Sequence, residues 1–149
     1  MQENYHRHQI SDFLTKHLKT IRSTRNHILK EFYEEHTGER DAFKGMMDQY
    51  LDFLKGFIDA NPEVSVKQRW PLILIGSVAE VQDLDYSEIE RLKIVPPFYG
   101  DGGGGLDCAS CLSPVGYALL FKGVGDRVTV DTPLGNCRFM IKSVELPPV

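Results

Sequence analysis

Four acidic side chains that could bind a metal ion lie where two helical patterns of the sequence meet. They are Glu34, Glu35, Glu39 and Asp41. Carboxylate oxygens are the ligands that a hard divalent cation prefers. Glu39 and Asp41 are separated only by Arg40, which offsets part of their charge. The cluster therefore fits either a metal-holding tip or a solvated helix start whose acids complement the helix dipole, and both interpretations stay open.

Cysteines and glycines form two further patterns. Cys108 and Cys111 are spaced as a CxxC pair, but a structural zinc site requires four ligands. Cys137 is the only other thiol, and the second half of the chain has no histidine, so we predict no metal site at the cysteines and place the thiols in or beside strands. The glycine run in YGDGGGGLD lacks the Lys and the Ser or Thr of a P-loop and predicts a loop between two strands.

Periodic apolar residues predict a long first helix. From Ile10 to His36 they recur at steps of three, four or seven, with Arg25 at the one seam position that is not apolar. Ser11 is a candidate cap for this helix. Such a helix would be about 40 Å long, which is more than a compact small domain needs, so we predict that something long projects. Its apolar positions are Ile10, Leu14, Leu18, Ile21, Ile28 and Phe32.

A turn at Thr37 and Gly38 separates a second helical pattern from the first, and Asn61 and Pro62 predict its end. Its apolar stripe is wider than a two-helix seam requires. Packing on the first helix is the simplest explanation, and a second contact with the other domain, another protein or a second copy of the chain stays open. The stripe consists of Phe43, Met46, Met47, Tyr50, Phe53, Leu54, Phe57 and Ile58.

The second half of the chain predicts a small α+β domain. In Ser113–Asp126, Ser113 is a preferred N-cap, Pro114 suits the first helical position and Gly123 suits the left-handed residue that ends a helix. Two alternating runs around a Pro and Gly turn in RVTVDTPLGNCRFMIKSV predict a β-hairpin. The predicted parts are an antiparallel helical hairpin in residues 1–62, a linker in 63–71 and a sheet domain in 72–149.

The same residues carry a resemblance to a known family. SPVGYALLFKGVGDRVTVDTPLGNCRFMIKSV resembles the closing segment of the GreA/GreB family of bacterial transcript cleavage factors, including its Ser-Pro and its Thr-Pro-x-Gly turn. IGSVAEVQDLDYSEIERLKIV is similar to that family's first hairpin. The order and spacing of these motifs over roughly half the chain carry the resemblance. It implies an N-terminal coiled-coil finger and a C-terminal antiparallel sheet of FKBP-like fold with one short helix.

The resemblance also implies a partner and a docking site. Family members dock at the rim of the RNA polymerase secondary channel, and their finger enters the channel. Carried over, the docking residues of this chain are Leu112, Ser113 and Pro114. Capping of the short helix explains Ser113 and Pro114 equally well. We therefore predict a polymerase-binding elongation factor that is not itself an enzyme.

The tip distinguishes two versions of this function. The family uses an Asp and a Glu three residues apart to help hold a second Mg²⁺ ion at the polymerase active site, where it can activate water for RNA cleavage. Glu39 and Asp41 do not reproduce that spacing, and each helix is roughly two turns shorter, which withdraws the tip by about 10 Å. We predict weak transcript cleavage, no stably bound cofactor and at most an Mg²⁺ ion shared with polymerase. The alternative is a non-cleaving regulator similar to the nucleoside diphosphate kinase regulator, and a third class is an FKBP-type peptidyl-prolyl isomerase.

Composition and charge narrow the class further. With 149 residues and a net charge of −4, the chain is not a generally basic nucleic-acid coat. Its N-terminus has no apolar signal region, and its longest apolar run, Leu72–Ile75, is too short to span a bilayer, so we expect a cytoplasmic protein without membrane contact. Basic residues on the first helix either keep it solvated or contact nascent RNA. They are Lys16, Lys19, Arg22, Arg25 and Lys30, with His17 and His27 nearby.

Overall fold

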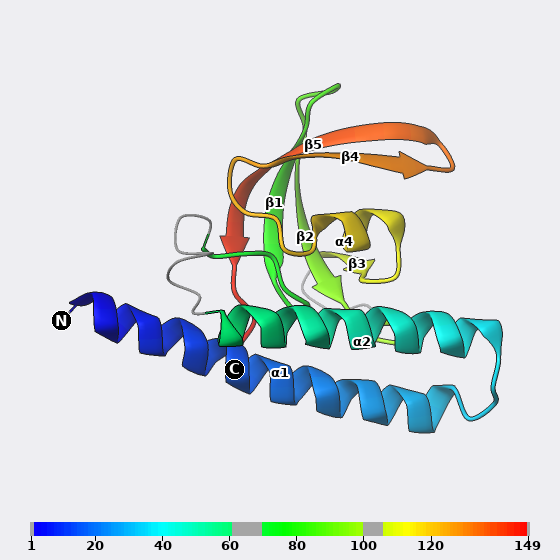
Figure 1. Cartoon of the computed structure of the whole chain (residues 1–149). Helices are drawn as coiled ribbons and strands as arrows, with labels where there is room; N and C mark the ends of the chain where they lie inside the picture. The colour runs from blue at the N-terminus through cyan, green and yellow to red at the C-terminus, as the bar shows by residue number, and fades with distance from the viewer. Residues whose placement is uncertain (1, 61–69, 100–105, 149) are drawn as a thin grey trace. The chain divides into compact units, whose positions relative to one another are not determined.

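The computed structural model describes residues 2–60, 70–99 and 106–148, and the chain divides into two compact units, residues 1–68 with 149 and residues 69–148. Figure 1 shows two long helices in the first unit and a curled sheet with a short helix in the second. The predicted linker lies outside the described residues except for Trp70 and Pro71, so the predicted domain limits stay predictions. Within the described ranges, no helix is long and apolar enough to cross a bilayer.

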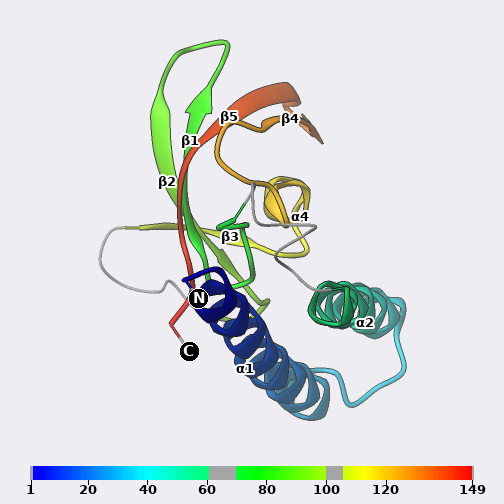
Figure 2. The same cartoon turned by 60° about the vertical axis from the view of Figure 1, so that its left-hand side comes forward.

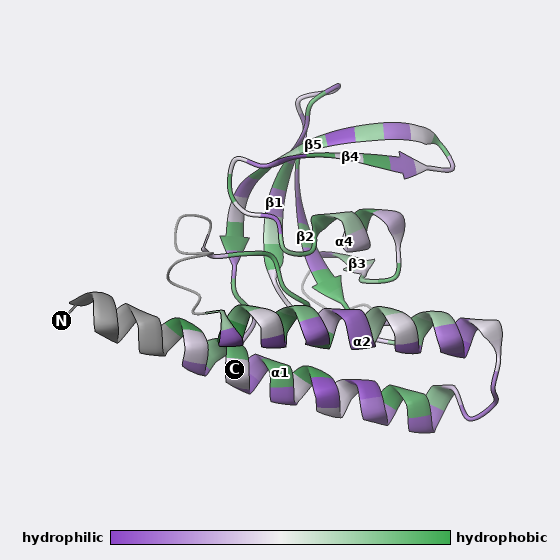
Figure 3. Cartoon of the chain, in the orientation of Figure 1, coloured by the Kyte–Doolittle hydropathy of each residue, from purple (hydrophilic) through white to green (hydrophobic). Residues whose placement is uncertain are grey.

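The first unit is an antiparallel pair of helices, α1 (Gln2–Phe32) and α2 (Gly38–Asp59), which lie side by side in both views (Figure 1, Figure 2). Apolar and polar residues are interspersed along α2 and along the coloured part of α1 (Figure 3), and the apolar side chains between the helices are buried. Burial of apolar surface is the main force that pairs the helices, at about 25 cal/mol per Å². The seam consists of Leu14, Leu18, Ile21 and Ile28 of α1 with Phe43, Met47, Tyr50, Leu51 and Leu54 of α2.

The predicted helical hairpin is confirmed, but α1 begins and ends at other residues than expected. α1 begins at Gln2, so Ser11 lies inside the helix and the prediction that it is the cap is wrong. The residues before Ser11 include Gln and Glu, which are good helix formers and extend a helix without any apolar pattern. α2 ends before Ala60, whose amide donates to the carbonyl of Gly56. Asn61 and Pro62 lie outside the described residues.

The end of α1 also differs from the prediction. The helix ends at Phe32 rather than His36. In a continuing helix the Thr37 amide would donate to the carbonyl of Tyr33, but it donates instead to the carbonyl of Glu35, at 3.0 Å. The chain therefore turns before His36. Thr37 then caps α2, because its side-chain oxygen accepts a hydrogen bond from the amide three residues later at 3.2 Å.

The second unit is a curled sheet of five strands with one short helix. Its elements are β1 (Val78–Asp83), β2 (Ile89–Val95), β3 (Asp107–Ser110), α4 (Pro114–Leu119), β4 (Arg127–Thr132) and β5 (Gly135–Glu145). The strand order is β3-β2-β1-β5-β4, and α4 packs against β3 and β4. The predicted α+β class and both predicted hairpins, β1–β2 and β4–β5, are confirmed.

One pair in this sheet is parallel rather than antiparallel. β3 runs parallel to β2, with Leu92 opposite Asp107 and Val95 opposite Ser110, whereas every other named strand pair is antiparallel. A tight turn forces two strands to run in opposite directions, but β3 is joined to β2 by residues 96–106 and can enter the sheet in either direction. The alternation of side chains along a strand carries no signal of its direction.

The short helix α4 ends earlier than the sequence predicts. Its last residue is Leu119, and the left-handed residue that follows is Phe121, with φ 65°, rather than Gly123. The Phe121 amide donates to the carbonyl of Ile73 at 2.7 Å, and the Ile73 amide donates to the carbonyl of Lys122 at 2.9 Å. These two long-range bonds draw the chain into an extended segment before Gly123 is reached. The prediction that Gly123 ends the helix is therefore wrong.

The three thiols lie in or beside strands, as predicted. Cys108 is in β3, Cys137 is in β5, and Cys111 directly follows β3. All three are free, and burial raises the pKa of Cys111 to about 11. Its thiol is therefore protonated and unreactive near neutral pH. The predicted glycine-rich loop lies outside the described residues, in 100–105.

Candidate functional sites at the short-helix cap and the hairpin tip

The three residues predicted to dock, Leu112–Pro114, begin in the turn after β3 and end at the first residue of α4, and we call them the cap loop. The carbonyl oxygen of Ser110 accepts two hydrogen bonds from Ser113, one from its hydroxyl at 2.7 Å and one from its amide at 2.9 Å. The Ser110 hydroxyl accepts a third, from the Leu112 amide at 3.1 Å. Ser113 Oγ in turn accepts from the Gly116 amide at 3.1 Å, which confirms its predicted role as the helix cap. The loop is thus held in one conformation by a single residue of β3.

Gly116 makes this arrangement sterically possible. A Cβ atom at position 116 would lie 2.0 Å from the carbonyl oxygen of Ser110 and 3.1 Å from Oγ of Ser113. Because the nearer obstacle is backbone, a side chain at this position must displace the loop itself. Our sequence analysis missed Gly116. The available signal was a glycine inside a short helix, where it costs roughly 1 kcal/mol relative to alanine and is retained only for a packing or conformational reason.

The cap loop presents an apolar surface. Leu112 is 38% exposed, Pro114 is exposed at the first position of α4, and Tyr117 is 56% exposed. Helical residues three positions apart share a face, so Tyr117 continues the surface that Pro114 begins. Apolar and aromatic side chains on a rigid backbone are typical of the central part of a protein interface.

The predicted tip acids, Glu39 and Asp41, both lie in the first turn of α2 but do not converge. Helical residues two positions apart point to nearly opposite sides of the helix, so this spacing does not favour a cation shared by the two carboxylates. Among the described residues, no group of three or more His, Cys, Asp or Glu side chains could hold a metal ion. The two acids instead place negative charge at the positive end of the helix dipole, which stabilises the start of α2.

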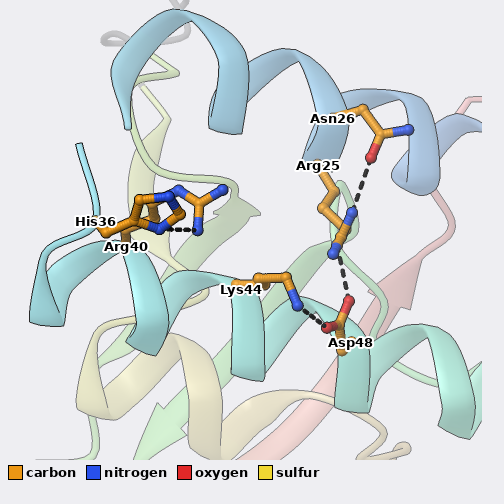
Figure 4. Close-up of polar contacts among 6 residues, drawn as sticks. All are labelled: Arg25, Asn26, His36, Arg40, Lys44 and Asp48. Atoms are coloured by element: carbon orange, nitrogen blue, oxygen red, sulfur yellow. Dashed lines mark hydrogen bonds and ion pairs between the residues drawn. The ribbon is translucent and has the colours of Figure 1, made fainter. Parts of the chain in front are cut away.

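Arg40, which separates these two acids, is bonded to the end of the hairpin. Its Nε donates to the carbonyl oxygen of Tyr33 at 3.0 Å, and its Nη1 lies 3.3 Å from Nδ1 of His36 (Figure 4). The Tyr33 ring packs on Phe43, with ring centroids 5.4 Å apart and planes inclined by 31°. Burial raises the pKa of Tyr33, and the negative charge of Glu39 raises it further. From the sequence we considered only the positive charge of Arg40. Its contacts could not be predicted, because no local pattern indicates which carbonyl group a long side chain will reach.

A histidine in the helical seam is not part of the basic surface of α1. His17 is only 4% exposed, and its Nε2 lies 2.7 Å from the hydroxyl of Tyr50. Burial lowers the pKa of His17 from 6.5 to about 4, so the ring is neutral at neutral pH. The interpretation that His17 helps to contact RNA is therefore wrong, whereas His27 is exposed as that interpretation requires.

One residue of the predicted basic surface, Arg25, is neutralised by an acid of the facing helix. Nε of Arg25 lies 2.8 Å from Oδ1 of Asp48, which also pairs with Lys44 at 3.4 Å (Figure 4). Arg25 is thus the polar residue that the sequence indicated in the seam. Its charge is compensated there by the carboxylate of Asp48. A groove of about 540 Å³ at this place carries both signs of charge and is lined by Arg22, Arg25, Asn26, Asp48, Leu51 and Asp52.

Known proteins resemble this chain in sequence. A family model described as "Transcription elongation factor, GreA/GreB, C-term" matches residues 70–146. The chain is 35% identical over 72 residues to transcription elongation factor GreA of Solidesulfovibrio magneticus. The aligned region covers 48% of this chain and 43% of that relative. It is 29% identical over 144 residues to GreA of Nitratidesulfovibrio vulgaris, which covers 89% of each chain. The chain thus spans less than half of the first relative and most of the second.

A solved structure is also similar. GreA factor homolog 1 (Gfh1) of Thermus thermophilus has 21% sequence identity and a TM-score of 0.44, with 95% of this chain and 94% of that chain covered. The family match, by contrast, spans more than half of the sequence and contains both β-hairpins, the cap loop and α4. The chain therefore belongs to the GreA/GreB family of transcription elongation factors.

Proposed function

We propose that this protein binds RNA polymerase through its cap loop and modulates elongation with its helical hairpin at the secondary channel, without being an enzyme itself. The observation that carries this proposal is the cap loop, which Ser110 holds in one conformation while Leu112 and Pro114 stay exposed. A loop that is already ordered loses little conformational entropy on binding. With this partner, the protein would act in the cytoplasm, as expected from the sequence.

The tip supports a factor that acts without a metal ion of its own. The Mg²⁺ ion that the family implies does not fit here, because Glu39 and Asp41 point to opposite sides of α2 and Arg40 adds a cation between them. The hairpin can still occupy a channel and alter the movement of polymerase. This geometry favours a polymerase-binding regulator that does not stimulate transcript cleavage over a cleavage factor. A transcript cleavage assay distinguishes the two.

The first prediction concerns docking. Leu112→Asp should weaken binding to core RNA polymerase at least about tenfold, since a buried apolar contact at the centre of an interface is worth 1 to 2 kcal/mol or more. Leu134→Asp is the matched control, because Leu134 is a fully exposed leucine at the turn of the β4–β5 hairpin and is not part of the cap loop. Titration of labelled protein with polymerase gives both dissociation constants. Equal affinities of the two variants would contradict the proposed docking surface.

The second prediction concerns transcript cleavage. On backtracked elongation complexes, the protein should add little 3′ cleavage to that of polymerase alone, because the spacing of Glu39 and Asp41 along α2 does not favour a shared cation. The double substitution Glu39→Ala and Asp41→Ala should then change the cleavage rate less than about twofold. A GreA relative assayed on the same complexes is the positive control. Rapid cleavage that disappears in the double variant would show that the tip does hold a metal ion.

Two further partners stay predictions. Contact with nascent RNA would have to use the exposed basic residues of α1, such as Lys16, Lys19 and Lys30. Retention of single-stranded RNA by the protein should then fall steeply with salt, since phosphate contacts release counterions. A homodimer would show in the mass of the protein in solution.

A further inference from the structure

We propose that Arg40 is a positioning residue that fixes the tip loop, residues 33–37, and thereby determines how the end of the hairpin is presented to polymerase. This inference rests on the proposed function. It goes beyond that function because it attributes the effect of the hairpin tip on polymerase to the geometry of a loop that an arginine holds in place. Its basis is the set of bonds that one residue makes to the loop. Arg40 contacts three of the loop residues, Tyr33, His36 and Thr37.

The loop needs such a partner because α1 ends before it. The last carbonyl groups of a helix have no amide donor within the helix and must accept hydrogen bonds from elsewhere. The carbonyl of Tyr33 lies just beyond Phe32, the last residue of α1, and it accepts a hydrogen bond from Nε of Arg40 at 3.0 Å. The side chain that closes the loop therefore comes from the first turn of the opposite helix.

The contacts require an arginine rather than any cation. A guanidinium group donates from several nitrogens in a fixed planar arrangement, so one group can hold a carbonyl oxygen with Nε and a ring nitrogen with Nη1. A lysine carries a single ammonium group at the end of a flexible chain and cannot reproduce both directions. The backbone of Arg40 contributes as well, because its amide donates to Oγ1 of Thr37 at 3.2 Å.

The other side of the loop is held by an aromatic contact. The ring of Tyr33 lies 5.4 Å from the ring of Phe43, which is completely buried in the hairpin. Tyr33 is therefore fixed through its ring by Phe43 and through its carbonyl by Arg40. The next two residues of the loop, Glu34 and Glu35, are exposed. Their positions depend on how Tyr33 is fixed. A released loop would present the same charges in many positions.

The test separates binding from the effect of bound protein. Arg40→Lys and Arg40→Gln should bind polymerase with the affinity of the original protein, because the cap loop is unchanged. Their maximal effect on pausing, measured at saturating protein, should fall about tenfold, as expected when a functional group loses its fixed position. Amide hydrogen exchange in residues 33–37 should become faster in both variants. Lys44→Gln is the matched control, since it removes a positive charge one turn further along α2 without touching the loop.

Each outcome decides the question. Full effect at saturation in Arg40→Lys would show that charge suffices and would overturn the inference, as would unchanged hydrogen exchange in the loop. A rise in the dissociation constant together with a lower melting temperature would assign Arg40 a merely structural role and would also overturn it. If the original protein neither binds polymerase nor alters pausing, the proposed function fails, while hydrogen exchange still tests the bonds of Arg40 on their own.

Discussion

Replacing Gly116 with alanine is expected to destabilise the sheet unit by about 2 kcal/mol or more and to weaken polymerase binding about 100-fold. The new Cβ would meet the backbone of Ser110 at 2.0 Å, so the cap loop has to move away from β3. Ser113 would then lose its bonds to Ser110, and Leu112 would no longer be held for docking. Denaturant unfolding followed by the fluorescence of Trp70, the only tryptophan and a residue of this unit, measures the first effect. Titration with polymerase measures the second.

The control for this substitution is a second glycine in a helix. Gly45→Ala adds the same methyl group to α2, where no heavy atom lies within 4 Å of the new Cβ. It should stabilise the helical unit by up to about 1 kcal/mol through higher helix propensity and leave binding unchanged. Wild-type stability and affinity in Gly116→Ala would mean that the close approach to Ser110 does not position the loop.

Acid should weaken the helical unit through His17. The pKa of this residue is 6.5 in an unfolded chain and about 4 in the folded protein, so between these values the unfolded chain binds more protons. The contribution of the neutral His17 ring to the free energy of unfolding is complete above pH 6.5 and is lost as the pH falls toward 4. Its full size is about 3 kcal/mol, from the free energy that corresponds to each unit of pKa. Urea unfolding monitored by far-ultraviolet circular dichroism at several pH values would show the loss.

A double substitution isolates this contribution. His17→Leu with Tyr50→Phe removes both partners of the 2.7 Å contact, which avoids leaving one buried polar group unsatisfied. The slope of stability against pH between 6.5 and 4 should then become shallower than in the original protein. His27→Gln, at an exposed position of the same helix, should keep the original slope. An unchanged slope in the double variant would rule out His17 as the source of acid sensitivity.

Local patterns in the sequence predicted the elements of this fold well. Apolar residues at steps of three and four indicate a helix whatever its surroundings, and they located both α1 and α2. Ser113 was recognised as a cap because capping involves only neighbouring residues. Helix ends were less predictable. α4 ends before Phe121 because of bonds to Ile73, a residue far away in the sequence, and no local signal announces such bonds.

The candidate sites show the same division between local and distant causes. The spacing of Glu39 and Asp41 already indicated that the tip differs from the family pattern, because positions along a helix fix directions in space. The place of Ser113 and Pro114 at the start of a helix was also predictable, because capping depends on neighbouring residues. Neither the contact of Gly116 with Ser110 nor the burial of His17 could be predicted, since each depends on how separate segments pack.

The ion pair between Arg25 and Asp48 restricts the sliding of α1 along α2. Apolar seam contacts are non-directional and alone would tolerate a slip by one helical turn, about 5.4 Å. Such a slip would separate a pair whose atoms are 2.8 Å apart and leave a guanidinium that is only 18% exposed without its carboxylate. The two helices therefore keep one register, and the hairpin has a constant reach instead of behaving as a telescoping arm.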